Sequence, residues 1–145
     1  MFTIDTSVWV NAYSPAEAGH AASRSFLDAL FSTTHPVFVP TLLPVELAGA
    51  IARVRGDSQL ATGIARAMFQ LSTIRWVALN DEVAQRALQI AADHRLRGAD
   101  AIYAAVALAH NCELVSLDQE HLTRLTTVVR TSTPADAIQR LQPSA

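Results

Sequence analysis

The stretch FTIDTSVWV, residues 2–10, places an aspartate directly after a short apolar run. Such a run is typical of a strand buried on both faces, and a helix is expected to follow at 7–13. Asp5 precedes two hydroxyl residues, Thr6 and Ser7. An Asp-Thr-Ser triplet is compatible with a protease half-site, a helix cap or one ligand of a metal ion. The rest of the chain decides between these three meanings.

The chain alternates short apolar runs with longer helical stretches. Strands are predicted at 2–4, 37–39, 76–79, 113–116 and 127–130, and helices at 7–13, 16–32, 41–55, 58–72, 81–96, 99–111 and 134–141. This alternation predicts βαβ units, and therefore an α/β fold with a mostly parallel sheet of four to five strands covered on both faces. With 145 residues, the chain is expected to form a single domain, 1–145.

The composition is that of a globular protein with one unusual feature. Half of the residues are hydrophobic, yet no apolar run reaches the roughly 18 residues that a membrane span needs. No secretory signal is visible, and the single Cys112 is expected to be a buried residue in a reducing cytoplasm. All eleven basic residues are arginine. Arginine suits phosphate contacts, although codon or organism bias explains the same excess.

Three aspartates lie at strand-to-helix junctions or helix starts, where a parallel fold collects its binding site. Asp5 ends the first strand, and Asp118 lies two residues after the strand that ends at Ser116. Asp100 lies near the start of a very apolar helix, in the sequence RLRGADAIYAAVALA. Taken singly, each of the three is equally compatible with a helix cap, a turn or a favourable helix N-terminus.

Glu46 lies in TLLPVELAGAIAR, a helical stretch that is apolar on nearly all sides. This pattern predicts a buried helix, and a buried carboxylate must become protonated or find a cation. If Glu46 joins Asp5, Asp100 and Asp118, the four like charges repel one another. A divalent cation is the simplest remedy, and a site made only of carboxylate oxygens favours Mg²⁺ or Mn²⁺.

Other interpretations of the first aspartate lack their expected context. An aspartic protease half-site would have glycine after the Asp-Thr pair and a second copy, and a phosphotransferase would have a second acid where Ser7 stands. The sequence contains no G-x-S-x-G, no Gly-rich phosphate loop and no H-E-x-x-H motif. The histidines show no ligand spacing and are expected to be surface or packing residues: His20, His35, His94, His110 and His121.

Four segments together resemble the PIN-domain ribonucleases, especially the VapC-type toxins of bacterial toxin–antitoxin systems. They are IDTSVWVNAY (4–13), LLPVELAGAIARVR (42–55), LRGADAIYAAVALA (96–109) and LVSLDQEHL (114–122), and they occur in the family order. The resemblance implies a three-layer α/β/α PIN-like domain with acidic residues at one end of a parallel sheet. It also implies RNA phosphodiester cleavage that depends on one or two Mg²⁺ or Mn²⁺ ions.

Carried over residue by residue, the catalytic and metal-binding acids would be Asp5, Glu46, Asp100 and Asp118. The hydroxyl of Thr6 or Ser7 would be an auxiliary contact. Ser7 is favoured, and it is also a candidate cap for a helix that starts at Val8. A further polar residue, Gln119 or Glu120, would lie near the last aspartate.

Two arginines have a possible role in substrate binding. Arg53 lies seven residues after Glu46, about two helical turns, and Arg97 lies three residues before Asp100. Either is positioned to touch RNA phosphates, which would make binding sensitive to salt. The alternative for both is a solvated or ion-paired arginine.

The apolar residues of the first helices are expected to lie in the core: Trp9, Tyr13, Phe26, Leu27, Leu30 and Phe31. In the toxins that this chain resembles, the first helices also help to form a groove for the antitoxin peptide and a dimer surface. The resemblance therefore implies a homodimer and a separately encoded antitoxin protein, in addition to the RNA substrate.

The leading hypothesis is a cytoplasmic, metal-dependent endoribonuclease, the toxin of a type II toxin–antitoxin pair. One alternative is a catalytically silent PIN-like module that binds RNA or protein. The presence of all four acids counts against it, since a silent relative would tolerate their loss. Another alternative is a nuclease for DNA or flap structures, but the chain is too short for the extra elements of those larger relatives.

Overall fold

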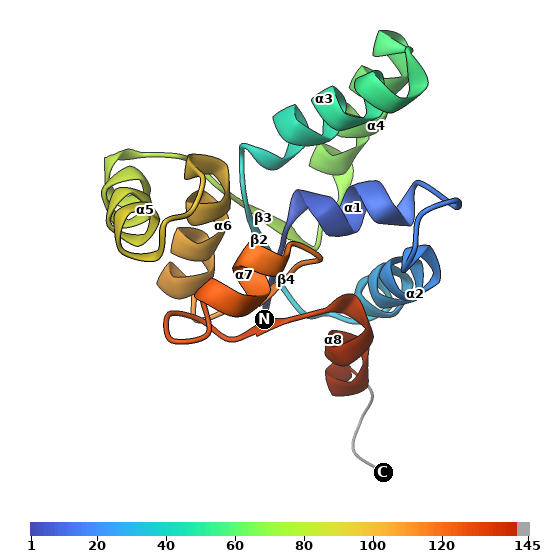
Figure 1. Ribbon diagram of the computed structural model, residues 1–145. Helices are drawn as coiled ribbons and strands as arrows, with labels where there is room; N and C mark the ends of the chain where they lie inside the picture. Colours follow the sequence, from blue (N-terminus) through green and yellow to red (C-terminus); the bar gives the residue numbers. More distant parts are fainter. Residues whose placement is uncertain (142–145) are drawn as a thin grey trace.

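A five-stranded, all-parallel sheet runs through the centre of the structure (Figure 1). This computed structural model describes residues 1–141. The strand order is β3-β2-β1-β4-β5. The strands are β1 (Phe2–Ile4), β2 (Val37–Pro40), β3 (Ile74–Val77), β4 (Glu113–Val115) and β5 (Thr131–Ser132). The predicted α/β fold with a parallel sheet is confirmed.

Helices flank the sheet on both sides. They are α1 (Thr6–Ala12), α2 (His20–Phe31), α3 (Leu43–Arg55), α4 (Ser58–Ala67), α5 (Asp81–His94), α6 (Gly98–Ala109), α7 (Gln119–Arg124) and α8 (Pro134–Leu141), with a 3-10 turn η1 at Met68–Gln70. Figure 1 shows α5 and α6 on one side of the strands and α1, α2 and α8 on the other. Helix α6 lies directly over β1, β2 and β4, and its residues 103–107 are all buried.

The predicted strand at 127–130 is wrong. Leu125 begins a turn there, because its carbonyl accepts hydrogen bonds from the N–H groups of Val128 and Val129. The two valines pack against the core from this turn, so their apolar character does not mark a strand. Strand β5 follows them. The predicted strand at 76–79 begins and ends two residues earlier, as β3, and Asn80 caps α5 by accepting from the Val83 N–H.

Two helix predictions also need correction. The helix expected at 16–32 begins only at His20, because Gly19 has a left-handed backbone conformation with φ of 86°. Helix α7 was not predicted, since Gln119–Arg124 is short and carries no apolar periodicity. Asp118 starts this helix by accepting a hydrogen bond from the Glu120 N–H at 2.7 Å.

The helix around Glu46 is not buried as predicted. Figure 1 shows α3 and α4 as a hairpin that projects from the body of the molecule. Leu47 and Ile51 face the core, whereas Val45 on the opposite side of α3 is 68% exposed. The hairpin bends at Gly56, which has φ of 67°. A helix that is apolar all round therefore has one covered face and one apolar face open to solvent.

The predicted apolar core is confirmed for most of its members. Trp9, Phe26, Leu27 and Leu30 are buried, and Phe31 is partly buried, but Tyr13 is 45% exposed. Cys112 is buried as expected, and burial raises the pKa of its thiol. Within residues 1–141, no helix is both long and apolar enough to cross a membrane.

We expect Leu114→Ala to lower the free energy of unfolding by about 2–5 kcal/mol, because Leu114 is fully buried in β4 and its loss leaves a cavity. Urea unfolding followed by circular dichroism measures this change. Leu88→Ala is the matched control, since Leu88 is 63% exposed on α5 and should change stability by less than about 0.5 kcal/mol. Equal effects of the two substitutions would contradict the assignment of the core.

Candidate active site

The carboxyl ends of β1 and β4 bring two of the predicted acids to one point of the sheet edge. The strands are parallel neighbours, and the Asp5 N–H donates to the Val115 carbonyl at 3.0 Å. From β1 the sheet extends through β2 on one side and through β4 on the other, so the strand order reverses here. Ligand sites of parallel sheets lie at such a switch point. Asp5 and Asp118 therefore lie where a site is expected.

Asp5 is fixed by three hydrogen bonds to a single carboxylate oxygen. It is buried and caps α1, because its Oδ2 accepts from the Ser7 N–H at 3.1 Å. The Ser7 hydroxyl donates to the same oxygen, and so does the Ser116 hydroxyl at 3.1 Å. Within the described part of the chain, the other oxygen, Oδ1, receives no hydrogen bond. Its lone pairs are open to a ligand.

The expectation that Ser7 caps a helix starting at Val8 is wrong, since α1 begins at Thr6 and its cap is Asp5. Ser7 has a different role. Its hydroxyl donates to Asp5 and accepts from the Leu117 N–H at 3.1 Å. Ser7 thereby ties the segment after β1 to the segment after β4 and fixes the orientation of Asp5.

Glu46 belongs to a cluster of three side chains from three helices. Its Oε2 accepts from the Thr6 hydroxyl on α1 and from the Tyr103 hydroxyl on α6, each at 2.8 Å. The two hydroxyl oxygens are 2.6 Å apart. Burial raises the pKa of the Tyr103 phenol well above its ordinary value, and the neighbouring Glu46 carboxylate raises it further. Tyr103 is therefore a neutral donor that orients Glu46.

Asp100 and Asp118 share one arginine. Arg97 Nε donates to Asp100 Oδ2 at 2.8 Å, and Arg97 Nη2 donates to Asp118 Oδ2 at 2.7 Å. The hydrogen bond that Arg97 donates to Asp100 is the largest cause that raises the pKa of the Arg97 guanidinium, and the charges of Asp100 and Asp118 raise it further. The sequence left two roles open for Arg97, an RNA contact or an ion pair. In this structure Arg97 is ion-paired.

A buried serine and a buried histidine connect the acids from below. The Ser116 hydroxyl donates to Asp5, accepts from the Asp118 N–H at 3.0 Å and lies 2.9 Å from His121 Nδ1. The His121 ring is fully buried, and its Nε2 lies 3.2 Å from the Asp100 carbonyl oxygen. His121 is therefore more than the surface or packing residue that the sequence predicted, because it joins the segments that carry Asp100 and Asp118.

The two residues expected after the last aspartate lie at the margin of the site. The Glu120 carboxylate forms an ion pair with Arg124 at 3.1 Å. Within residues 1–141, Glu120 forms one hydrogen bond with the Asp118 side chain, and it is donated by the Glu120 backbone N–H. Gln119 is exposed at the start of α7. Glu120 thus helps to hold Asp118, and its carboxylate is engaged elsewhere.

Arg53 lies on the exposed side of the α3–α4 hairpin, one helical turn beyond Gly49. Its Nη1 lies 3.4 Å from the position that a Cβ on Gly49 would take, so the guanidinium folds back along α3 in the direction of Glu46. This placement agrees with the prediction that Arg53 and Glu46 project from nearly the same face.

The four acids gather at one edge without forming a closed metal cluster. Across residues 1–141, no three histidine, cysteine, aspartate or glutamate side chains are close enough to hold an ion together. The donor set is nevertheless made of carboxylate and hydroxyl oxygens, which hard divalent cations prefer. One oxygen of Asp5 is open, and the pair Asp100 and Asp118 already binds a cationic group, Arg97. The residues present are therefore compatible with Mg²⁺ or Mn²⁺.

Sequence reasoning did not identify three residues of this network: Tyr103, Ser116 and His121. Tyr103 lies three residues after Asp100 on the same helix face, and Ser116 directly follows β4. The helical spacing of Tyr103 and the strand-end position of Ser116 could both have been recognised in the sequence as features of a site at the strand ends. His121 lies three residues after Asp118, but the spacing is informative only once α7 is known to be a helix.

Comparison with known proteins identifies the family. The family model of the PIN domain matches residues 2–126, so the chain belongs to the PIN domain family. This confirms the resemblance inferred from the four sequence segments. No protein of curated function matches the chain by sequence.

Solved structures of toxin–antitoxin proteins share the fold. FitAcB from Neisseria gonorrhoeae matches with a TM-score of 0.70 and 21% identity, covering 92% of this chain and 98% of that chain. VapC20 from Mycobacterium tuberculosis, a Sarcin-Ricin loop cleaving toxin, matches with a TM-score of 0.70 and 18% identity, over 82% and 91%. A toxin–antitoxin complex from Klebsiella pneumoniae matches with a TM-score of 0.66 and 18% identity, covering 92% of this chain and 98% of that chain. At these identities the similarity concerns the fold.

We expect Tyr103→Phe to lower the free energy of unfolding by about 1–2 kcal/mol, because Glu46 and Thr6 lose a buried partner. The difference in unfolding free energy between the wild type and Tyr103→Phe should become smaller at alkaline pH. The unfolded phenol ionises near pH 10, whereas the raised pKa keeps the folded phenol neutral. Wild-type stability from this group is therefore complete below about pH 10 and declines above it.

Urea unfolding between pH 7 and 10.5 measures both effects. Tyr13→Phe is the matched control, since Tyr13 is the other tyrosine and is exposed. An equal and pH-independent effect of the two substitutions would contradict the role given to Tyr103.

Proposed function

We propose that this protein is a divalent-metal-dependent endoribonuclease that acts as the toxin of a toxin–antitoxin pair. The observation that carries the proposal is the arrangement of Asp5, Glu46, Asp100 and Asp118 at the switch point of a PIN-domain sheet. Each of these acids accepts at least one hydrogen bond, with Arg97 as the shared donor to Asp100 and Asp118, so the four carboxylates are pre-oriented in a chain that belongs to a nuclease family.

In this proposal Asp5 and Asp100 hold the principal ion, and Glu46 and Asp118 complete its shell directly or through water. A bound divalent ion supplies an activated water and shields the charge of the phosphate and the leaving oxygen. Ser7 and Ser116 hold Asp5 through Oδ2 and leave Oδ1 for ligand binding. Glu46 is held through Oε2, which leaves Oε1 as an acceptor for a proton from water.

RNA is the proposed substrate class. Among the structural relatives, VapC20 is a Sarcin-Ricin loop cleaving toxin, and the PIN domain match of this chain supports a related activity. Exposed Arg53 on the projecting hairpin is a candidate contact for a phosphate beside the scissile bond. Such contacts make binding weaker as salt rises.

We expect Asp5→Asn and Asp100→Asn to reduce metal-dependent RNA cleavage by at least about 100-fold, because even outer partners of a metal site are worth about 10–100-fold. Cleavage of total bacterial RNA with Mn²⁺ or Mg²⁺, read by sequencing of the new RNA ends, measures the loss. Asp28→Asn is the control, since Asp28 is exposed on α2 and pairs only with Arg24 among residues 1–141.

All three variants should stay folded by circular dichroism. Retained cleavage in either site variant would overturn the assignment of the acids.

A catalytically silent module remains the competing function, and metal binding separates the two. Calorimetric titration of the wild-type protein with Mn²⁺ should show binding, accompanied by a rise in melting temperature. A protein that binds no Mn²⁺ and shows no melting shift would favour the silent, RNA- or protein-binding alternative.

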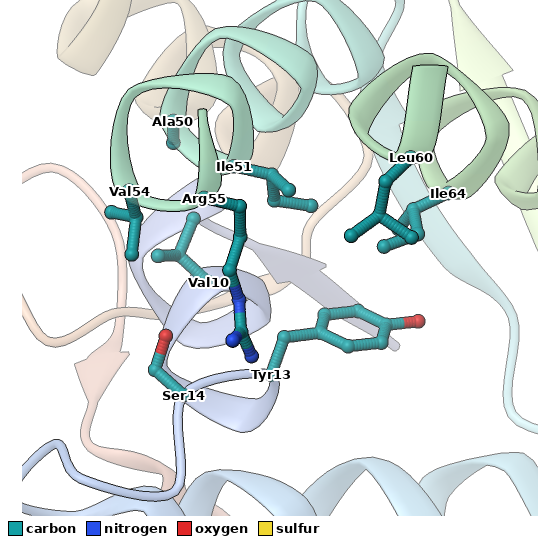
Figure 2. A pocket seen from close by; sticks show the side chains of 9 residues that line it. All are labelled: Val10, Tyr13, Ser14, Ala50, Ile51, Val54, Arg55, Leu60 and Ile64. Atoms are coloured by element: carbon teal, nitrogen blue, oxygen red, sulfur yellow. The ribbon is translucent and has the colours of Figure 1, made fainter. Parts of the chain in front are cut away.

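The partner in this proposal is a separately encoded antitoxin, in a complex with a toxin homodimer. An apolar groove between α1 and the α3–α4 hairpin supports it (Figure 2). The groove has a volume of about 220 Å³. It is lined mainly by apolar side chains of three helices: Val10, Tyr13, Ala50, Ile51, Val54, Leu60 and Ile64. Figure 2 shows Arg55 reaching from α3 toward Tyr13 and Ser14 at its opening.

We expect Val54→Asp and Leu60→Asp to weaken antitoxin binding by about tenfold or more, because a carboxylate would be desolvated against the apolar partner. Val54 and Leu60 are 70% and 45% exposed, so folding should not change. Co-purification with the product of any short reading frame immediately upstream of the gene measures binding. Leu88→Asp on α5 is the control, and undiminished binding by both groove variants would contradict the placement.

A further inference from the structure

The Arg97 guanidinium joins two acids from different segments of the site. Asp100 lies on α6, and Asp118 lies between β4 and α7. Arg97 donates to Asp100 Oδ2 at 2.8 Å and to Asp118 Oδ2 at 2.7 Å. Both are charge-assisted hydrogen bonds of short length, which are the stronger kind. One cation therefore holds the two carboxylates together across the switch point.

Arg97 is bound to the site but is not packed into the protein. Its side chain is 70% exposed, whereas the side chains of Asp100 and Asp118 are 13% and 24% exposed. Nearby Arg124 is engaged by Glu120 at 3.1 Å, so it does not replace Arg97 in this position. The guanidinium can leave the two carboxylates without opening the core. The acids cannot move as easily, because Asp118 caps α7 and Asp100 lies in the buried helix α6.

The need for a cation follows from charge. Two ionised carboxylates that approach one arginine within 3 Å repel each other when that arginine is absent. The guanidinium satisfies this pair of carboxylates through one oxygen of each, and a hard divalent ion held by Asp100 and Asp118 would satisfy the same two charges. Simultaneous binding of the two cations at full strength would place like charges side by side.

We propose that Arg97 is an internal counter-ion that occupies the Asp100–Asp118 pair until a divalent ion binds, and that the two compete for the same carboxylate oxygens. This inference rests on the metal-dependent function proposed above. It makes Arg97 the residue that sets the metal affinity of the site. The displaced guanidinium stays beside the site, since Arg97 is the N-cap residue of α6, and from there it contacts an RNA phosphate.

The test is the Mn²⁺ affinity of Arg97→Gln, measured by calorimetry without RNA. We expect the dissociation constant to fall roughly three- to tenfold below that of the wild type, as the loss of two exposed ion pairs allows. The melting temperature of metal-free Arg97→Gln should be lower than that of the wild type. Mn²⁺ should raise it by more than it raises the wild-type value. Binding of RNA should lose about one unit of its salt slope.

Arg24→Gln is the matched control. Arg24 is also exposed, and it pairs with Asp28 at 3.1 Å on α2, so its substitution removes the same charge outside the site. Unchanged or weaker Mn²⁺ binding by Arg97→Gln would overturn the proposal. An equal gain in both variants would also overturn it, because net charge alone would then explain the effect.

The outcomes separate this inference from the proposed function. If the wild type binds Mn²⁺ and cleaves RNA, but Arg97→Gln binds Mn²⁺ like the wild type, only the counter-ion proposal fails. If the wild type binds no Mn²⁺, both fail.

The Nε–H resonance of Arg97 in ¹⁵N-labelled protein gives a second readout that does not depend on activity. Saturating Mg²⁺ should move this resonance from its hydrogen-bonded position to that of a solvated arginine. A resonance that stays in place while Mg²⁺ binds would contradict displacement.

Discussion

The repulsion between carboxylates at one edge of a parallel sheet is the constraint on which the rest of the site depends. The Asp5 carboxylate is stabilised by hydrogen bonds from two serine hydroxyls and a backbone N–H, and the Glu46 carboxylate by hydrogen bonds from two hydroxyls on other helices. Asp100 and Asp118 are both stabilised by ion pairs with the Arg97 guanidinium. Because each acid accepts hydrogen bonds from neighbouring donors, all four carboxylates are held in place despite their mutual repulsion.

The same element builds the core and the site. Helix α6 covers β1, β2 and β4 with an almost continuous set of buried small and apolar residues. Its first turn carries Asp100, and Tyr103 follows on the same face to orient Glu46. The acids are therefore positioned by the packing that stabilises the fold, whereas the apolar groove between α1 and the α3–α4 hairpin leaves Val54 and Leu60 exposed and available to a partner.

The sequence predicted the sheet and the position of the acids because both follow from local signals. Short apolar strands and the strand-end rule placed Asp5 and Asp118, and the apolar stretch after Asp100 marked α6. The burial of α3 was predicted wrongly, because apolarity all round does not distinguish a core helix from one with an open apolar face. The pairing of Arg97 with Asp118 depends on the directions of two side chains that are 21 residues apart in the sequence, and periodicity carries no information on this.

The central claim is that the acids after β1 and β4 and at the start of α6 form one metal site. Anomalous diffraction from crystals grown with Mn²⁺ tests it most directly, since the position of the metal is then observed without reference to activity. The account predicts a peak in contact with the carboxylates of Asp5 and Asp100, and an Arg97 guanidinium that has left Asp118. A Mn²⁺-saturated crystal with no peak at this edge, or with its peak elsewhere on the protein, would contradict it.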